Sequence, residues 1–276
     1  MSDKKQVTFY IPTWNSLKTL KSAWKSIIRQ KLAHVFVVDN NSFDGSKEWF
    51  EKNRIKVIYQ TKKGLANARN LAIRKCQSEL LASIDADCVL DKYWLKYALV
   101  HLDNPKVAGL CGRLIEKNTA TLPDRWREFH LGQHWGNNNI NPPFLFGSNS
   151  IFRKQALLTV KGYNEKFGSN FEDVDISRKL KNAGYTLVYE PRCICYHMKN
   201  DSIRSILDTQ RRWTYYSYPL PNSFLGLLLR ITMYNPHLFL KWIIKDVSSF
   251  RFDLAFITFL SFFYNEYYDI RDYIRP

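Results

Sequence analysis

The stretch Leu80-Leu-Ala-Ser-Ile-Asp-Ala-Asp-Cys-Val-Leu90 is the part of the sequence from which the fold is best predicted. Its apolar start, from Leu80 to Ile84, predicts a buried strand that ends at Asp85 and Asp87. On extended backbone, residues two positions apart point to the same side, and unpaired carboxylates at the edge of a core repel each other and lose hydration. A divalent cation resolves that conflict because Mg²⁺ and Mn²⁺ prefer carboxylate oxygens. The alternative is a pair of solvated aspartates in a turn.

Composition limits the class of protein. The chain has 276 residues, of which 45% are hydrophobic, so it can bury a sizeable core as one α/β domain or as one domain with an appendage. Its formal net charge of +16 favours anionic partners, which include nucleic acid, an anionic membrane surface and phosphorylated substrates. The five cysteines contain no Cys-x-x-Cys pair, which suits a reduced, cytosolic protein. No signal peptide is expected, and no run of roughly 18 apolar residues predicts a spanning helix.

Hydrophobic periodicity predicts strands that alternate with helices in the first third of the chain. Apolar runs predict strands at 7–12, 34–38, 55–59 and 80–84, and helical spacing predicts helices at 17–29, from 46 and from 64. This alternation is typical of an α/β protein with a mainly parallel sheet and right-handed crossovers. In such sheets, ligands bind beyond the carboxyl ends of the strands.

Polar residues gather at the ends of these four strands. They are Thr13 and Asn15, Asp39, residues 60–63, and Asp85 with Asp87. Neither Gly-x-Gly-x-x-Gly nor a Walker-type lysine loop follows the first strand, which argues against a dinucleotide enzyme and a P-loop NTPase. Lys62, Lys63 and Arg69 supply positive charge near the carboxylates, as a nucleoside diphosphate requires.

Four segments resemble the family 2 glycosyltransferases, which are inverting enzymes of the GT-A fold. They are Phe-Tyr-Ile-Pro-Thr-Trp-Asn at 9–15, Val-Val-Asp-Asn-Asn-Ser-Phe-Asp-Gly-Ser at 37–46, Lys-Gly-Leu-Ala-Asn-Ala-Arg-Asn at 63–70 and Asp-Ala-Asp at 85–87. The resemblance covers about 7–197, and it implies that the nucleotide is held by Pro12, Thr13, Asn15, Asp39, Lys63, Gly64, Arg69, Asp85 and Ala86. Asp39 as a helix cap and Arg69 as a solvated helix residue remain the alternatives.

The same resemblance implies a divalent metal, Mn²⁺ or Mg²⁺, that neutralises charge on the leaving diphosphate. Its implied ligands are Asp85, Asp87 and His197. His197 follows a strand expected at 192–196, and an ordinary buried, hydrogen-bonded histidine is the alternative.

The second half of the chain carries the acceptor side of the resemblance. Glu172 and Asp173 match the Glu-Asp pair of the family at the start of a helix expected to reach residue 180, and the resemblance makes Asp173 the general base. Inversion needs a carboxylate that takes the proton of the acceptor hydroxyl while that oxygen attacks the anomeric carbon. The alternative is a helix start that favours acidic residues through its dipole. Gly147 and Ser148, in a glycine-interrupted strand expected at 144–152, are implied to line the donor sugar and acceptor.

Two histidines lie four residues apart in a stretch that is difficult to assign. His130 and His134 could bind a metal from one helix face, but Gly132 weakens that helix and no third ligand is near. We therefore expect both in an acceptor-side loop within 124–143, and a further strand at 108–113 before it.

The segment 208–213, Asp-Thr-Gln-Arg-Arg-Trp, resembles the Gln-x-x-Arg-Trp signature of processive polysaccharide synthases but is one residue short. It implies that Arg212 and Trp213 contact the substrate. Because the spanning helices of those synthases are also missing, we expect the addition of a single sugar.

Composition changes after residue 218. Apolar, aromatic segments at 224–229, 238–244 and 254–264 are interspersed with Arg230, Lys241, Lys245 and Arg251. Helices of this kind can lie in the headgroup region of a membrane with basic side chains reaching lipid phosphates. A helical cap on the catalytic domain or a homodimer interface is the alternative. We expect a GT-A domain over 1–218, with a nucleotide-sugar half to about 115 and an acceptor half from 116, followed by a helical, aromatic-rich appendage over 219–276.

The expected activity is inverting, metal-assisted transfer of one hexosyl or N-acetylhexosaminyl unit from a nucleotide sugar, with UDP-sugar as the first choice of donor. The expected acceptor is a hydroxyl of a glycan or lipid-linked acceptor at the cytoplasmic face of a membrane. Nucleic acid is not an expected partner, since nucleic-acid binding leaves the carboxylates at the strand ends unexplained. A basic nucleic-acid- or membrane-binding protein with a degenerate site, and a sugar-phosphate nucleotidyltransferase, are the rival classes.

Overall fold

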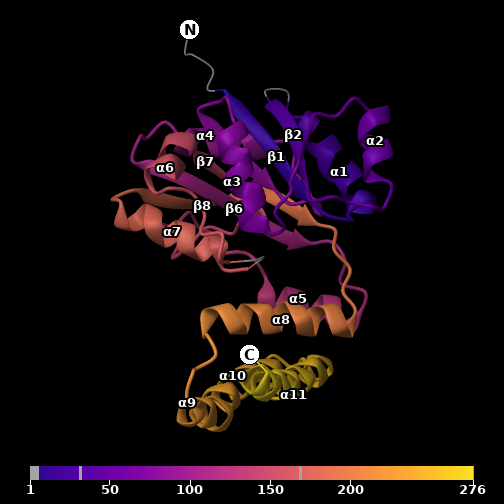
Figure 1. Ribbon diagram of the computed structural model, residues 1–276, viewed down its shortest axis with the longest axis vertical. Coiled ribbons are helices and arrows are strands. Elements are labelled where there is room, and N and C mark those ends of the chain that lie inside the picture. The colour runs from indigo at the N-terminus through magenta and orange to yellow at the C-terminus, as the bar shows by residue number, and fades with distance from the viewer. Residues whose placement is uncertain (1–5, 31–32, 168–169, 276) are drawn as a thin grey trace. The chain divides into compact units, whose positions relative to one another are not determined.

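The computed structural model describes residues 6–30, 33–167 and 170–275, and these form two compact units (Figure 1). The sheet unit consists of Met1–Lys117 and Gln133–Lys199, and the helical unit consists of Asn118–Gly132 and Asn200–Pro276. The helical unit thus begins earlier than the expected appendage at 219–276 and includes a segment from the middle of the chain. Residues 1–5, where no signal peptide is expected, lie outside the described part of the chain.

The sheet unit contains an eight-stranded mixed sheet with the order β3-β2-β1-β4-β7-β6-β8-β5. The strands are β1 (Val7–Thr13), β2 (Ala33–Asp39), β3 (Val57–Tyr59), β4 (Leu80–Ile84), β5 (Cys88–Leu90), β6 (Val107–Glu116), β7 (Asn149–Arg153) and β8 (Thr186–His197). The first four strands along the chain pair in parallel, β7 is antiparallel to both its neighbours, and β6 and β8 are parallel to each other. The parallel half therefore has the predicted architecture.

Helices cover both faces of this sheet. They are α1 (Leu17–Ile28), α2 (Ser46–Lys52), α3 (Leu65–Lys75), α4 (Trp94–His101), α6 (Lys154–Thr159) and α7 (Glu172–Asn182). Phe9 and Ile11 of β1 pack in one core with α1, α2 and α4, whereas Tyr10 packs in a second core with α3, α6 and α7. Because successive residues of β1 face opposite cores, both faces of the strand are apolar, as is typical of a covered parallel sheet.

The register of the parallel strands brings their carboxyl ends level with one another. Thr13 pairs with Asp39, and Asp39 pairs with Tyr59. The polar residues that follow β1, β2 and β3 therefore meet at one edge of the sheet.

Two predicted strands are shorter than expected. The strand expected at 55–59 forms only at Val57–Tyr59. The strand expected at 144–152 forms only at Asn149–Arg153. The backbone N–H of Gly147 donates to Asp173 (3.2 Å), and the carbonyl of Ser148 accepts from the N–H of Asp85 (3.0 Å). These groups bond to loops and a helix rather than to a neighbouring strand.

The helical unit consists of α5 (Leu122–Leu131), α8 (Ile203–Ser217), α9 (Phe224–Leu229), the π-helical turn η1 (Arg230–Tyr234), α10 (Asn235–Ser248) and α11 (Phe252–Ile274). In this unit α11 packs against α10, α8 and α5. A small core joins these helices through Trp126, Ile206, Leu207, Leu254 and Ile257. None of the described helices is both long and apolar enough to cross a membrane.

The prediction of a loop around His130 is wrong. His130 lies in α5, which ends at Leu131, so Gly132 is the residue that caps the helix and does not interrupt it. The imidazole is buried, and its Nε2 lies 2.6 Å from Oδ1 of Asp246, which is itself fully buried. Burial lowers the pKa of His130 despite this carboxylate. His130 is therefore a structural residue of the helical unit, whereas His134 follows α5 outside any helix.

Candidate functional site

A pocket lies where the carboxyl ends of the parallel strands meet, and its volume is about 400 Å³. It is lined by Pro12, Thr13, Trp14, Val38, Asn40, Gln60, Gly64, Leu65 and Ala68. These residues come from the ends of β1 and β2, from the segment after β3 and from the start of α3. Small-molecule sites are commonly apolar pockets of this size with a few polar groups. The predicted residues Pro12, Thr13 and Gly64 all line it.

Asn15 follows β1, and Asp39 is the last residue of β2. Asp39 is buried, and its carboxylate accepts hydrogen bonds from the N–H and the hydroxyl of Ser42, the latter at 2.6 Å. The Asn15 side chain accepts a hydrogen bond from the N–H of Phe43 (2.9 Å), and Asn15 itself has a left-handed φ of 49°. Hydrogen bonds of the predicted residues Asn15 and Asp39 thus stabilise the loops that follow β1 and β2.

The turn into α3 completes the pocket. Gly64 precedes α3 with φ 120°, a backbone region that strains residues with a Cβ. Its carbonyl accepts a hydrogen bond from the side chain of Gln60 (3.0 Å). Lys63 next to it is exposed, whereas Lys62 forms an ion pair with Glu165 at 2.7 Å. Of the two lysines at this turn, Lys63 is the exposed one that does not pair with Glu165.

Arg69 of α3 links three separate segments of the sheet unit. Its side chain is only 2% exposed, and Nη1 donates to the hydroxyl of Ser83 (2.5 Å) and to the carbonyl of Gly147 (2.9 Å). Asp85 lies 3.7 Å from Nη2, and Glu172 lies 3.4 Å from Nε. Arginine suits such a place because its planar fork presents several donors in fixed directions. The guanidinium thus ties the end of β4, the segment before β7 and the start of α7 together.

Gly147 has no side chain because Arg69 fills the space. A Cβ at this position would lie 2.6 Å from Nη2 of Arg69, closer than any side chain tolerates. Next to it, Ser148 is buried and its hydroxyl donates to the side-chain carbonyl of Gln133 (2.5 Å). The predicted pair Gly147 and Ser148 therefore lies within the same network as Asp85.

Glu172 and Asp173 open α7, as predicted, and both are buried. Burial raises the pKa of Glu172 to about 7, against the opposing effect of Arg69. Burial also raises the pKa of Asp173, although Arg69 and the N–H of Gly147 counteract it. A carboxyl with a raised pKa is better matched to taking a proton near neutral pH. Phe171, which precedes the pair, has a left-handed φ of 75°, a backbone conformation often found at functional sites.

Asp85 and Asp87 follow β4 in a short turn, not in the extended backbone that the sequence suggested. Burial raises the pKa of Asp85 to about 6, and Arg69 opposes the shift. Asp87 lies 3.3 Å from Nε2 of His197, whose Nδ1 lies 2.9 Å from Glu116. Burial lowers the pKa of His197, but the hydrogen bonds to Asp87 and Glu116 outweigh it and raise that pKa to about 10. Thus Asp87 pairs with His197, whereas Asp85 pairs with Arg69.

These residues fit a divalent cation that is shared with a ligand. Among the described residues, no group of three or more His, Cys, Asp and Glu side chains is arranged to hold an ion by itself. Asp87 and His197 are close enough to be neighbouring ligands, and Oδ1 of Asp85 is buried, lies 3.7 Å from Nη2 of Arg69 and accepts no hydrogen bond from any described residue. Mg²⁺ is usually bound by one or two carboxylates together with substrate phosphates and water. Two or three protein ligands therefore suffice.

Arg212 and Trp213 belong to α8 of the helical unit, not to the sheet unit that holds Gly147 and Ser148. Arg212 is exposed, and its guanidinium donates to the hydroxyl of Thr209 one turn earlier (3.1 Å). Their expected contact with substrate stays a prediction.

Sequence analysis did not assign a role to several residues at this site. Trp14 is 55% exposed at the pocket, Tyr163 lies under the guanidinium of Arg69 (5.7 Å), and Glu116 orients His197. Trp14 could have been found as the aromatic residue directly after the first strand. Glu116 and Tyr163 carry no local signal, because their partners are far away in the sequence.

A pocket at the strand ends, in the same unit as Asp85, Asp87 and the buried pair Glu172 and Asp173, is where α/β proteins commonly bind a small molecule. The model of the family described as glycosyl transferase family 2 matches residues 8–160, so the chain belongs to this family of glycosyltransferases. The chain is 21% identical over 221 residues to the poly-beta-1,6-N-acetyl-D-glucosamine synthase of Staphylococcus aureus. That match covers 75% of this chain and 53% of the synthase, so the chain spans about half the length of the curated relatives it matches.

Solved structures show the same fold. The mannosyltransferase PcManGT from Pyrobaculum calidifontis, in complex with GDP-Man and Mn²⁺, has a TM-score of 0.62 at 16% identity over 98% of this chain and 88% of that one. S. aureus TarS 1-349 in complex with UDP-GlcNAc has a TM-score of 0.56 at 19% identity over 75% of this chain and 64% of that one. The fold is therefore the predicted GT-A fold.

Proposed function

We propose that the protein is an inverting, metal-assisted glycosyltransferase that moves one sugar from a nucleoside-diphosphate sugar to a hydroxyl of a glycan or lipid-linked acceptor. The observation that carries this proposal is the connection through Arg69. The buried guanidinium of Arg69, on the helix α3 that lines the pocket, pairs with both Asp85 and Glu172. Glu172 is the neighbour of Asp173 in the sequence. Donor chemistry and acceptor chemistry need carboxylates of these two kinds at a short distance from each other.

On the donor side, we assign the pocket at the strand ends to the nucleoside. Trp14 and the apolar wall of Val38, Leu65 and Ala68 suit a base, and Asn40 and Gln60 supply polar groups that can select it. Asp39 shapes the loop that carries Asn40. Exposed Lys63 is placed to meet the diphosphate at the turn into α3. UDP-sugar is the first donor to test, and the neighbour bound to GDP-Man makes a GDP-sugar the second.

We further propose that Asp87 and His197 hold a Mn²⁺ or Mg²⁺ ion together with Asp85. When bound, the ion neutralises negative charge on the leaving diphosphate. Glu116 orients the imidazole from its other side, as carboxylates commonly do for metal-binding histidines. These side chains would hold the ion, and oxygens of the bound diphosphate would be its further ligands.

We assign the general base to Asp173. Inversion needs a carboxylate that accepts the proton of the acceptor hydroxyl as its oxygen attacks the anomeric carbon and the nucleoside diphosphate leaves. The N–H groups of Gly147 and Val174 hold the two oxygens of Asp173 in place. Glu172, paired with Arg69, positions the start of α7 and keeps the guanidinium charge balanced. The curated relatives are named for an N-acetylglucosamine polymer, so an N-acetylhexosaminyl donor is tested before other sugars.

Calorimetric titration of UDP, GDP and dTDP, with and without Mn²⁺, tests this proposal. We expect one nucleotide to bind in a Mn²⁺-dependent manner, and we expect Asp85→Ala to lose that dependence. Glu79→Ala is the matched control, because it removes a carboxylate at the opposite end of β4, where Glu79 pairs with Arg153. Failure of all three nucleotides to bind to the wild-type protein would overturn the donor assignment. Turnover of a sugar phosphate with a nucleoside triphosphate would instead identify a nucleotidyltransferase.

A further inference from the structure

The outer face of α11 is apolar over the whole length of this helix. Its large exposed side chains recur every three or four residues at Phe252, Phe256, Phe259, Phe263, Tyr267 and Ile270. The five aromatic rings are each 50% to 63% exposed. With roughly 200 Å² per ring, they present about 500 Å² of apolar surface to the surroundings. That area alone is as large as the largest patch of a typical monomer.

The neighbouring helices also carry large exposed apolar side chains. Leu240, Ile244 and Val247 of α10 are 48% to 55% exposed at helical spacing. On α9 and η1, Phe224 and Met233 are 69% and 65% exposed. In the following we call the exposed large apolar residues of α9, η1, α10 and α11 the apolar face.

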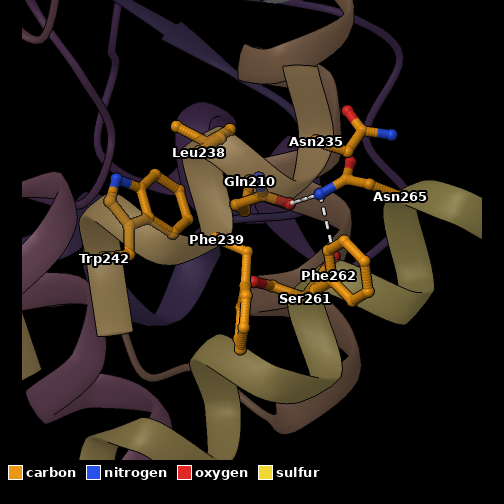
Figure 2. A pocket seen from close by; sticks show the side chains of 8 residues that line it. All are labelled: Gln210, Asn235, Leu238, Phe239, Trp242, Ser261, Phe262 and Asn265. Atoms are coloured by element: carbon orange, nitrogen blue, oxygen red, sulfur yellow. Dashed lines mark hydrogen bonds between the residues drawn. The ribbon is translucent and has the colours of Figure 1, made fainter. Parts of the chain in front are cut away.

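The buried side of the same helices is mostly polar. The buried residues of α10 are Asn235 and Asp246, and four of the six buried residues of α11 are the polar Thr258, Ser261, Asn265 and Asp269, beside Leu254 and Ile257. Figure 2 shows part of this interior, where the Asn265 side chain donates to the carbonyls of Gln210 and Ser261, both at 2.8 Å. A helix at the surface of a protein in water has the opposite arrangement, with its apolar stripe turned inward.

Two fully buried carboxylates of the helical unit, those of Asp246 and Asp269, each have charged or polar partners. Asp269 is fully buried and binds Arg211 (2.5 Å) and Arg230 (2.6 Å). Asp246 is fully buried between His130 and the hydroxyl of Thr258 (2.6 Å). Such networks hold helices together when there is little hydrophobic drive to bury apolar groups between them, which is the situation in lipid.

We propose that the apolar face of the helical unit binds the surface of a lipid bilayer, with α11 lying in the plane of the membrane. A helix with one apolar side along its full length buries that side only when it lies parallel to the interface. Exposed Lys241 on α10 and partly exposed Arg251 before α11 stand next to this face, where they can meet lipid phosphates. This inference does not depend on the proposed glycosyl transfer.

A lipid surface explains the unit better than a second copy of the chain. A dimer in water also needs an apolar patch on each subunit. The interior of each subunit, however, would still be expected to be apolar. Here the hydrophobic core of the unit is small, while polar side chains occupy the interior of α10 and α11. On α8, by contrast, the exposed side chains include Arg204 and Arg212, so the unit has a charged side as well as an apolar one.

Co-sedimentation with phosphatidylcholine vesicles tests this proposal on the full chain. We expect the wild-type protein to bind these uncharged vesicles and to remain bound when salt is raised from about 0.1 M to about 1 M, which screens charges beyond a few ångströms. The variant Phe256→Ser/Phe259→Ser/Phe263→Ser should lose binding by about 100-fold or more. The matched control Ile203→Ser/Tyr215→Ser changes exposed residues of α8 and should bind like wild type.

Three other outcomes would overturn the proposal. Binding only to anionic vesicles, and only at low salt, would show adsorption through the basic surface of the protein. Equal binding by the triple variant would show that another surface binds lipid. A wild-type dimer in solution that ignores vesicles and dissociates in the triple variant would identify a second copy as the partner.

A labelling experiment covers the case in which the triple variant does not fold. All five natural cysteines are buried, so a nitroxide can be attached selectively at Phe259→Cys or, as a control, at Ile203→Cys. With vesicles present, the label at 259 should become accessible to oxygen and protected from a water-soluble nickel complex. The label at 203 should show no such change. Equal exposure of both labels to the nickel complex would also overturn the proposal.

Discussion

Nε of Arg69 lies 3.4 Å from Oε1 of Glu172, so a helix that lines the pocket at the strand ends and the helix that carries the carboxylate pair share one buried ion pair. The same guanidinium reaches Asp85 and the carbonyl of Gly147. Movement of any of these groups must therefore disturb the others. Three of the predictions below depend on this coupling.

Replacing Arg69 with lysine should impair catalysis more than folding. Lysine keeps the charge but lacks the fork that donates hydrogen bonds to Ser83 and Gly147 and pairs with Glu172. We expect kcat to fall by about 100-fold, as for other losses of positioning, while the KM for the donor changes little. Steady-state kinetics measure both quantities. Arg74→Lys, on the exposed side of the same helix, is the control, and an unchanged kcat in Arg69→Lys would disprove the positioning role.

Gly147→Ala should disturb the same network from its other end. The new methyl group would lie 2.6 Å from Nη2 of Arg69, and relieving this overlap should cost about 1–3 kcal/mol of unfolding free energy. Activity should fall with it, because Gly147 also donates to Asp173. The double variant with Arg69→Lys should lose less than the sum of the two single losses, since lysine gives the methyl group room. Additive losses would contradict a direct clash.

Asp173→Asn should abolish transfer and leave nucleotide binding intact. Asparagine still accepts a hydrogen bond from the N–H of Gly147, but it cannot take a proton from the acceptor. Product formation from a labelled donor and calorimetric binding of the nucleotide are the two measurements. Asp175→Asn serves as the control, because Asp175 is equally buried on α7 but pairs with Lys179 (2.9 Å). Transfer by Asp173→Asn at the wild-type rate would show that Asp173 is not the base.

Glu190 should make the stability of the sheet unit dependent on acid pH. Burial opposes its charge, but hydrogen bonds from Arg192 and His101 outweigh burial and lower the pKa of Glu190 from its ordinary 4.5 to about 2. A lowered pKa means that the charged form stabilises the folded state above about pH 4.5, and that this contribution is lost as the pH falls toward 2. Glu190→Gln should therefore cost about 1–2 kcal/mol at pH 7, allowing for the exposure of Arg192, and almost nothing near pH 2. Urea unfolding at several pH values measures this difference; a loss that does not change with pH would exclude the linkage.

Asp269→Asn should destabilise the helical unit strongly. The carboxylate is fully buried between Arg211 and Arg230, and its loss leaves buried positive charge, a change that costs about 3–5 kcal/mol. Thermal unfolding followed by circular dichroism should show an earlier loss of helix. Asp272→Asn is the control, since Asp272 also pairs with Arg211 but is 27% exposed. Equal effects of the two substitutions would contradict the structural role of Asp269.

The donor side of the site was predictable because its signals are local. Thr13, Gly64 and Asp85 each follow an apolar run or open a helix, and parallel strands necessarily bring such positions to one edge. Glu172 and Asp173 were found by resemblance at the start of a recognisable helix. The structure confirms where these residues lie in the fold, and their roles stay proposals.

The remaining features depend on contacts between distant parts of the chain. Arg69 was itself a predicted site residue, but its partners Gly147 and Glu172 lie 78 and 103 positions further along and could not be predicted. The loop predicted around His130 was wrong because the partner of that histidine, Asp246, is 116 residues away. The apolar, aromatic composition at 254–264 predicted a helix there, but composition alone cannot say which side of α11 is buried.

The insertion of α5 between β6 and β7 has a consequence for biosynthesis. Trp126 of α5 packs with Leu254 and Ile257 of α11, and its indole N–H donates to Thr258 (2.9 Å). Since proteins emerge from the ribosome in sequence order, Trp126 has to wait for more than a hundred further residues before these partners exist. During that interval the sheet unit can already fold around the gap at 118–132. Until the last helices are made, the nascent chain therefore exposes Trp126 and its apolar neighbours in a segment too short to be a stable helix alone.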